Sequence, residues 1–326
     1  MRRRDLIKLM ACSAVAWPFV AHAQTYPSRP VTMVVPFSAG GSFDVLGRLL
    51  TGRMSEVLGQ QVIVDNTTGA AGIIGTSRVA NATPDGYTFL LGSIGTHAYN
   101  PTIYKNLRYN AATDFAPVGL VADQPMVLVA RKDFPASNLP EFIAYVKANS
   151  TKLQYGSAGV GSTTHLSCSL LNSAIGVNVT HVPYRGGGPA AQDLIAGQID
   201  YLCLNIGGAA PLVTSNTVKG IATLTRNRAP NIPTLATAHE QGLADFDIST
   251  WNAFFLPKDT PAAIVKRLNE ATSATIDAPT VQARLHELGV VAAAPERRSP
   301  EYLGKFVREE IERWAGPIKA AGIQVE

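Results

Sequence analysis

Glycine and hydroxyl residues gather in one stretch of the chain, Tyr155–His165, with the sequence YGSAGVGSTTH. Apolar residues precede it, and leucines follow it at roughly helical spacing, which predicts a strand, a loop and then a helix. Backbone N–H groups at the start of a helix attract anions, and glycines let them approach a ligand closely. The loop lacks the Lys of a P-loop and the glycine spacing of a dinucleotide fingerprint, so we do not expect a nucleotide. Such a loop can also be a simple turn.

A second stretch of this kind lies about 120 residues earlier. The strand expected at Val31–Val35 leads into the loop Pro36–Asp44, and a helix with one leucine-rich face then ends at Gly59. A third junction, Asp65–Gly72, follows the strand expected at 62–64. Ligands of α/β sheets bind beyond the carboxyl ends of the strands. These junctions therefore predict two α/β lobes that face one ligand.

The rest of the chain continues this alternation, which predicts a mainly parallel sheet. We expect further strands at 88–91, 179–185, 199–205, 218–224 and 247–256, and helices at 139–149, 261–276, 280–288 and 300–321. The apolar stretch 115–130 is interrupted by Asp123-Gln124-Pro125, and we interpret it as two strands that run from one lobe into the next. Residues 247–256 are expected to cross back. Two strand-like crossings suit a hinge.

The first 23 residues have the features of an export signal. A basic start with Arg3-Arg4 precedes the apolar run 9–20, and Ala21-His22-Ala23 fits a cleavage site. Both the general secretory route and the twin-arginine route remain open. No later stretch approaches the ~18 to 20 apolar residues of a membrane span. We therefore predict a periplasmic protein without direct membrane insertion.

The signal also carries most of the net charge. It holds four of the 28 Lys and Arg residues and one of the 24 Asp and Glu residues, which leaves +1 for the remainder. Nucleic acid is therefore not an expected partner. Beyond the signal only Cys168 and Cys203 remain. They could pair in an oxidising compartment, but we favour two buried thiols, one on a helix and one on a strand. No spacing indicates a metal site or a cofactor.

Many ordered motifs from about Tyr26 to the C-terminus give the chain a family resemblance. They are YPSRP at 26–30, PF…GG…D at 36–44, DN…GA…G at 65–72, PDGYT at 84–88, THA…NP at 96–101, DFAP at 114–117, GVGSTTHL at 159–166, HVPY…GGG at 181–188 and PTL at 233–235. The chain resembles the Bug-type receptors of tripartite tricarboxylate transporters.

The resemblance implies an α/β, type II periplasmic-binding-protein fold, with a cleft between lobe 1 (24–125 and 250–326) and lobe 2 (126–249). It also implies a monomer that captures a small mono-, di- or aromatic carboxylate and delivers it to membrane transporter subunits. The ligand-binding residues expected on this basis are Phe37, Ser38, Gly40, Gly41, Ser42, Asn66, Ala71, Thr96, His97, Gly159, Gly161, Ser162, Thr163, His165, Tyr184, Arg185 and Asn205.

The chain departs from the family at several positions, so the identity of the ligand does not carry over. Leu204 stands near a place where the family often has an acidic residue, which argues against an amino-acid ligand. Two alternatives remain open: a receptor that presents its ligand to a membrane sensor kinase, and an exported hydrolase using Ser162, His165 and Asp200. The chain has no G-x-S-x-G nucleophile elbow, which disfavours the hydrolase.

Overall fold

In the computed structural model, the described residues, 26–244 and 246–323, form one ten-stranded sheet with helices packed on its faces. The predicted signal segment 1–23 lies outside these residues. The strands follow the order β2 (Val62–Asn66), β1 (Val31–Val35), β3 (Thr88–Ser93), β9 (Ser249–Pro257), β4 (Phe115–Ala130), β7 (Tyr201–Asn205), β5 (Gln154–Ser157) and β6 (Thr180–Pro183). Strands β8 (Lys219–Thr223) and β10 (Val291–Ala292) also pair with β4. The strands expected from the sequence are therefore present, except that 115–130 forms one strand.

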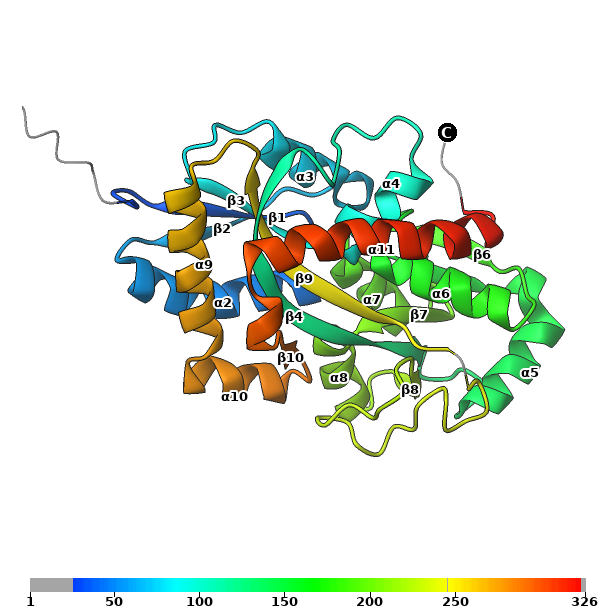
Figure 1. Ribbon diagram of the computed structural model, residues 1–326. Coiled ribbons are helices and arrows are strands. Elements are labelled where there is room, and N and C mark those ends of the chain that lie inside the picture. Colours follow the sequence, from blue (N-terminus) through cyan, green and yellow to red (C-terminus); the bar gives the residue numbers. More distant parts are fainter. Residues whose placement is uncertain (1–25, 245, 324–326) are drawn as a thin grey trace, which may run out of the picture.

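The sheet consists of two segments that share β4. Strands β1, β2 and β3 are parallel to one another, as are β5, β6 and β7. Where the two segments meet, β4 and β9 run antiparallel to each other and to their other neighbours. Figure 1 shows this strand pair running through the middle of the molecule. The prediction of a mainly parallel sheet is thus correct for the two outer groups of strands, and it is wrong for the central strands β4 and β9.

Residues 115–130 form one continuous strand rather than the two that we predicted. Strand β4 pairs with β9 as far as Pro125, opposite Ser249, and pairs with β7 from Met126 onward, opposite Asn205. Proline is tolerated at this point because the strand changes partners there. Gln124 lies opposite Thr250, so the two predicted crossings are side by side. The assignment of residues to the two lobes remains a prediction.

The helices between the strands are α2 (Ser42–Leu58), α3 (Ile73–Ala80), α4 (Asn100–Ile103), α5 (Leu139–Asn149), α6 (Thr163–Ala174), α7 (Gly187–Ile195) and α8 (Ile206–Thr214). The C-terminal helices are α9 (Ala262–Ile276), α10 (Pro279–Glu287) and α11 (Pro300–Ala320), close to the ranges predicted from the sequence. None of the helices in the described part is long and apolar enough to cross a membrane.

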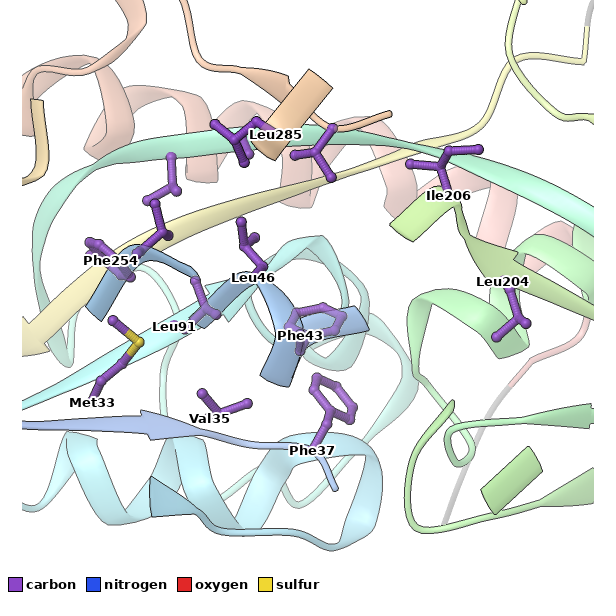
Figure 2. Packing of buried hydrophobic residues seen from close by; sticks show 14 of the residues in the cluster. Met33, Val35, Phe37, Phe43, Leu46, Leu91, Leu204, Ile206, Phe254 and Leu285 are labelled. Carbon is purple, nitrogen blue, oxygen red and sulfur yellow. The ribbon is translucent and has the colours of Figure 1, made fainter. Parts of the chain in front are cut away.

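One hydrophobic cluster extends over both sheet segments. Met33 and Phe254 belong to it in the first segment, and Leu204 and Ile206 belong to it in the second (Figure 2). The rings of Phe37 and Phe43 pack 4.5 Å apart, centroid to centroid, at the start of α2. Burial of these side chains fixes where the first turn of α2 begins.

Helix α11 is joined to the central strand pair by a buried carboxylate. Glu310 accepts hydrogen bonds from the indole N–H of Trp251, at 2.9 Å, and of Trp314, at 3.2 Å. Trp251 lies on β9, opposite Asp123 of β4. The C-terminal helix is therefore connected directly to the strands that link the two sheet segments.

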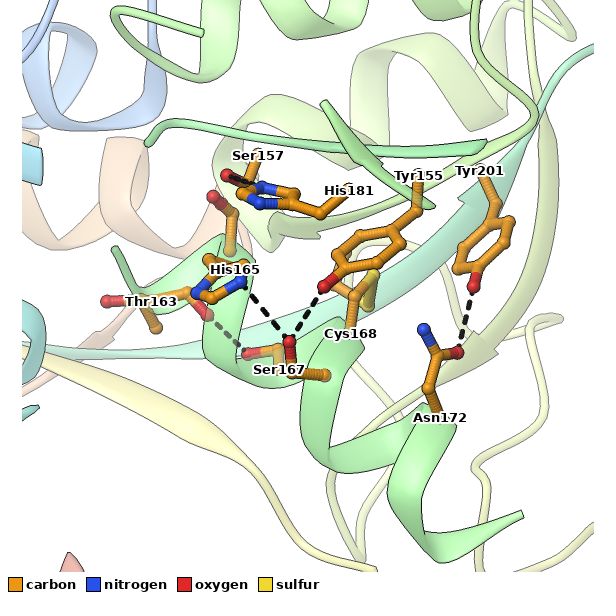
Figure 3. Close-up of a disulfide and its surroundings, with 12 residues drawn as sticks. Tyr155, Ser157, Thr163, His165, Ser167, Cys168, Asn172, His181 and Tyr201 are labelled. Atoms are coloured by element: carbon orange, nitrogen blue, oxygen red, sulfur yellow. Dashed lines mark hydrogen bonds between the residues drawn. A yellow bond between two sulfur atoms is a disulfide. The ribbon is translucent and has the colours of Figure 1, made fainter. Parts of the chain in front are cut away.

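Cys168 of α6 and Cys203 of β7 are bonded to each other, with their Cα atoms 5.5 Å apart, which corrects our preference for two free thiols (Figure 3). Both are fully buried, one on a helix and one on a strand as expected. The bridge fastens α6, which starts at the glycine-rich loop, to the neighbouring strand.

We predict that this bridge stabilises the protein by about 2 to 4 kcal/mol, because it closes a loop in the unfolded chain whose ends are 35 residues apart. The free energy of unfolding, measured by urea titration, should fall by this amount when the bridge is reduced. A Cys168→Ala/Cys203→Ala variant should unfold like the reduced protein and should not respond to reductant. Equal unfolding midpoints with and without reductant would contradict the prediction.

Candidate ligand-binding site

The N-termini of four helices meet at one narrow cavity. The residues that precede the first helical residue are Gly41 for α2, Ser162 for α6, Gly186 for α7 and Asn205 for α8. The cavity measures about 20 Å³, room for about one water molecule. It is lined by Phe37, Gly41, Ser42, Phe43, Ala158, Ser162, Thr163, Thr164, Gly187, Leu204 and Asn205. We call it the central cavity.

Three of the four helix starts lack a side-chain cap. Among the described residues, no side chain caps α2, α7 or α8, whereas at α6 the hydroxyl of Ser162 accepts from the N–H of His165. Uncapped first-turn N–H groups carry partial positive charge and need an acceptor. Three uncapped ends and the start of α6 around one cavity favour a negatively charged group there.

Two side chains of the central cavity add further unused polar atoms. Thr163 Oγ1 and Asn205 Nδ2 have no hydrogen-bond partner among the described residues, and each residue is only 3% exposed. A buried polar atom without a partner costs about 1–3 kcal/mol. Asn205 offers a donor and Thr163 a hydroxyl that can donate, so both suit an acceptor-rich ligand.

The loop before α2 is held by a buried carboxylate. Asp44 accepts from the N–H of Gly40 at 2.9 Å, from Arg48 at 3.0 Å and from the amide of Asn66 at 3.1 Å. Burial alone would raise the pKa of Asp44, but these hydrogen bonds outweigh it and hold the pKa below its usual value. Asn66 also donates to the carbonyl of Phe37 at 3.0 Å. Its two donors are thus engaged in the loop, and the structure does not place Asn66 in the cavity.

Loops of the two sheet segments touch each other beside the central cavity. A Cβ atom on Gly186 would collide with Ser38, and one on Gly161 would come within 2.6 Å of Asn100 Oδ1. The phenol of Tyr104, at the end of α4, donates to the carbonyl of Val160. Close approach of these backbones depends on glycine, which explains why the loops of this site contain so many.

A second, wider cavity of about 600 Å³ adjoins the central one, and the two share Ala158 as a lining residue. We call it the mouth cavity. It is lined by Gly69, Ala70, Ala71, Gly72, Tyr104, Ala158, Gly159, Val160, Pro183, Tyr184, Arg185 and Pro189. Both sheet segments contribute to it. The hydroxyl of Tyr184 donates to Asp193 at 2.7 Å, and burial together with this carboxylate raises the pKa of Tyr184 to about 12.

Two histidines support the glycine-rich loop from behind (Figure 3). Nδ1 of His165 accepts from the N–H of Gly161 at 3.2 Å, and Nε2 of His181 lies 2.6 Å from the hydroxyl of Ser157. The two imidazole rings are 4.1 Å apart, centroid to centroid. Burial lowers the pKa of His165 to about 3, with a further contribution from His181, and lowers that of His181 to about 4. Both rings are therefore neutral at pH 7.

His97 is fully buried away from both cavities. Its ring stacks on Phe255 at 3.8 Å, and its Nδ1 lies 2.9 Å from the hydroxyl of Thr96. Burial lowers the pKa of His97 to about 3. The short π-helix Gly95–Tyr99 turns both side chains into the protein, where their contacts are internal.

The residue types of a hydrolase triad are present but not connected. Ser162 donates to the carbonyl of Gly159 at 2.6 Å, and His165 contacts it through its backbone N–H, not its ring. Asp200 binds Arg131 and the N–H of Gln154. No hydrogen bond joins Asp200 to either residue among those described, so this geometry gives no support to the hydrolase alternative.

The structure gathers ten of the expected ligand-binding residues around the two cavities. These are Phe37, Gly41, Ser42, Ser162, Thr163 and Asn205 in the central cavity, and Ala71, Gly159, Tyr184 and Arg185 in the mouth cavity. Seven others line neither: Ser38, Gly40, Asn66, Thr96, His97, Gly161 and His165. Other lining residues, among them Tyr104, Leu204 and Gly187, were not predicted from the sequence. Gly187 belongs to a glycine loop noted there, whereas Tyr104 and Leu204 lie outside the glycine and hydroxyl motifs on which the prediction relied.

The fold is that of a periplasmic binding protein, and comparison with known proteins specifies the family. Residues 46–323 match the model of the tripartite tricarboxylate transporter family receptor. A UPF0065 protein of Agrobacterium vitis, from the TAR-I ttuE-ttuC' intergenic region, is 42% identical over 99% of this chain and 92% of its own length. Protein BugT of Bordetella pertussis is 32% identical over 97% of this chain and 96% of its own length.

Solved structures agree. Periplasmic binding protein BugD is 40% identical, with a TM-score of 0.90 over 92% of this chain and all of its own. MatC from Rhodopseudomonas palustris, solved with bound malate, is 41% identical, with a TM-score of 0.87 over 90% of this chain and all of its own. An R. palustris protein solved with adipate is 36% identical, with a TM-score of 0.87 over 92% of this chain and 99% of its own. This chain belongs to the Bug-type, tripartite tricarboxylate transporter receptor family of periplasmic binding proteins.

The buried His165 predicts a loss of stability in acid. Its pKa is about 3 in the folded protein and about 6.5 in the unfolded chain, so unfolding takes up a proton between these values. The stability that comes from His165 is therefore complete above pH 6.5 and is lost as the pH falls toward 3. In His165→Asn, whose amide oxygen can still accept from Gly161, the free energy of unfolding should depend less on pH, by about 1.4 kcal/mol per pH unit between pH 6 and 4.

Urea titrations at several pH values test this prediction. Above pH 7 the difference between wild type and variant should be constant, which provides the internal control. Parallel stability curves between pH 6 and 4 would show that His165 gains a proton in the folded protein as easily as in the unfolded chain.

Proposed function

We propose that the protein captures a small carboxylate in the central cavity and delivers it to a membrane transporter of the tripartite tricarboxylate type. One observation carries this proposal: four helix N-termini converge on a cavity that also holds the unused polar atoms of Thr163 and Asn205. A carboxylate brings two oxygens that can accept several hydrogen bonds at once, and its charge is favoured at helix starts.

The lining of the central cavity also argues against other ligand classes. No Asp or Glu side chain lines it within the described part of the chain, and the nearby Asp44 is engaged with Gly40, Arg48 and Asn66. Leu204 contributes apolar surface where an ammonium group would need an acceptor. A cation, or the ammonium group of an amino acid, would lose its hydration water in this cavity without gaining an acceptor. An acid without an amino group does not meet this cost, because its carboxylate finds donors there.

Relatives support the same ligand chemistry. MatC holds malate and another R. palustris protein holds adipate, at 41% and 36% identity to this chain. Both ligands are small dicarboxylates, and they belong to the carboxylate class that we propose here.

Ligand entry requires the cleft to open. The central cavity holds about one water at its present volume of about 20 Å³, which is too little for a small acid. We propose that the lobes separate by bending of β4 and β9, the strands that join the two sheet segments. Separation would part Ser38 from Gly186 and Tyr104 from Val160, and closure on the ligand would restore these contacts.

We further propose that the protein turns over no substrate and is exported by the general secretory or the twin-arginine route. A partner of the sensor-kinase kind would use the same cleft and the same closure. The site supports both outcomes equally, and the family favours transport.

The proposal is tested by thermal-shift screening of mono- and dicarboxylates, amines, amino acids and sugars. At 100 times its dissociation constant, a bound acid should stabilise the protein by ~2.7 kcal/mol. Asn205→Asp should weaken acid binding at least about a hundredfold, because it places a second negative charge beside the ligand in a buried site. It should leave the unliganded protein stable, since Asp also suits the start of a helix.

Asn205→Ser provides the matched control, because it removes the amide donor without adding charge. Its loss of affinity should be smaller, about tenfold. Stabilisation by amines or sugars alone, or equal acid affinity in wild type and Asn205→Asp, would rule out carboxylate capture at this cavity.

A further inference from the structure

The mouth cavity lies beside the central cavity, and Ala158 belongs to the lining of both. A ligand whose first carboxylate lies at the helix starts would therefore reach the wider space by passing Ala158 once the cleft opens. The difference in volume, about 20 Å³ against about 600 Å³, means that the mouth cavity offers room for most of a longer ligand.

The walls of the mouth cavity are mainly apolar. Small residues and prolines form much of it, and the hydroxyls of its two tyrosines bind elsewhere: Tyr104 to the carbonyl of Val160 and Tyr184 to Asp193. With their hydroxyls engaged, the rings offer chiefly hydrocarbon surface. A methylene chain or an aromatic ring suits these walls better than a chain of hydroxyl groups. Such hydroxyl groups would lose hydrogen bonds to water and would gain few from the walls.

The floor of the mouth cavity is held in an unusual backbone conformation. All residues of Gly69–Gly72 have positive φ, including Ala70 at 44° and Ala71 at 51°. Left-handed alanines cost roughly 1–2 kcal/mol each. Ala71 is buried and its backbone N lies 3.2 Å from the position that a Cβ atom on Gly159 would take, so this turn closes the wall against the opposite loop.

Arg185 is the one cationic residue in the lining of the mouth cavity, among the residues that the structure describes. It is exposed, and no hydrogen bond or ion pair to another described side chain holds it. Other arginines of the protein have acidic partners: Arg131, for example, pairs with Asp133 and Asp200. A guanidinium can bind a carboxylate through two parallel hydrogen bonds.

We infer that the mouth cavity selects dicarboxylates with an apolar spacer, and that Arg185 binds the second carboxylate. This inference rests on the proposed function, because the first carboxylate must lie at the helix starts. It defines the ligand class more narrowly: two acid groups separated by methylene or aromatic carbons, without hydroxyl groups along the spacer.

Calorimetric titrations with three ligands that share a six-carbon acid chain separate the contribution of the second charge from that of the apolar spacer. Adipate has both charges and an apolar spacer, its monomethyl ester lacks the second charge, and galactarate carries hydroxyl groups on the spacer. Wild type should bind adipate about five- to tenfold more tightly than either of the others, a modest factor because Arg185 is exposed.

Arg185→Ala should bring adipate to the affinity of its monomethyl ester and leave the affinity of the ester unchanged. Arg185→Lys should keep most of the preference for adipate, because it retains the charge. The preference for adipate over galactarate should survive in part in Arg185→Ala, since the walls are unchanged.

The outcomes distinguish this inference from the proposed function. Tight adipate binding that Arg185→Ala does not alter, or galactarate binding equal to that of adipate, overturns the inference and leaves carboxylate capture intact. Absence of binding for all three acids, with other carboxylates also inactive, overturns both.

Discussion

The starts of α2, α6, α7 and α8 meet at one cavity, and this concentration of backbone N–H groups governs the organisation of the site. Three of these helices lack a side-chain cap, and their partial positive charges face a single cavity. An arrangement of this kind is costly without a negative partner. In the function that we propose, the acid group of a ligand would resolve this conflict, since no cationic side chain of the described residues lines the central cavity.

The fold brings these four ends together through the long strands β4 and β9. Strand β4 pairs with β9 up to Pro125 and with β7 beyond it. Because its partner changes at this point, β4 belongs to both sheet segments. The cluster containing Met33, Leu204 and Ile206 packs across the same region, while Glu310 connects α11 to Trp251. The binding that we propose at the helix starts and the proposed movement of the strands would therefore involve one continuous part of the molecule.

The sequence predicted the family, the strand–loop–helix junctions and six residues of the central cavity, because glycines and hydroxyls before a helix report local geometry. The sequence could not distinguish residues that line the cavity from residues of the same amino-acid type that only stabilise the loops. Asn66 and Asn205 are both amides beside such loops, yet the first is engaged with Phe37 and Asp44 and the second has a free donor. The pairing of Cys168 with Cys203 and the role of Tyr104 depend on distances between remote segments, which no local pattern contains.

The most direct test of this account is a crystal structure of the protein with the acid that stabilises it most. We predict that one carboxylate of the ligand lies within hydrogen-bond distance of first-turn N–H groups from at least two of α2, α6, α7 and α8, and of the Asn205 amide. The account would be contradicted by an acid bound outside the central cavity, or by one held there only through side chains with the helix starts facing water.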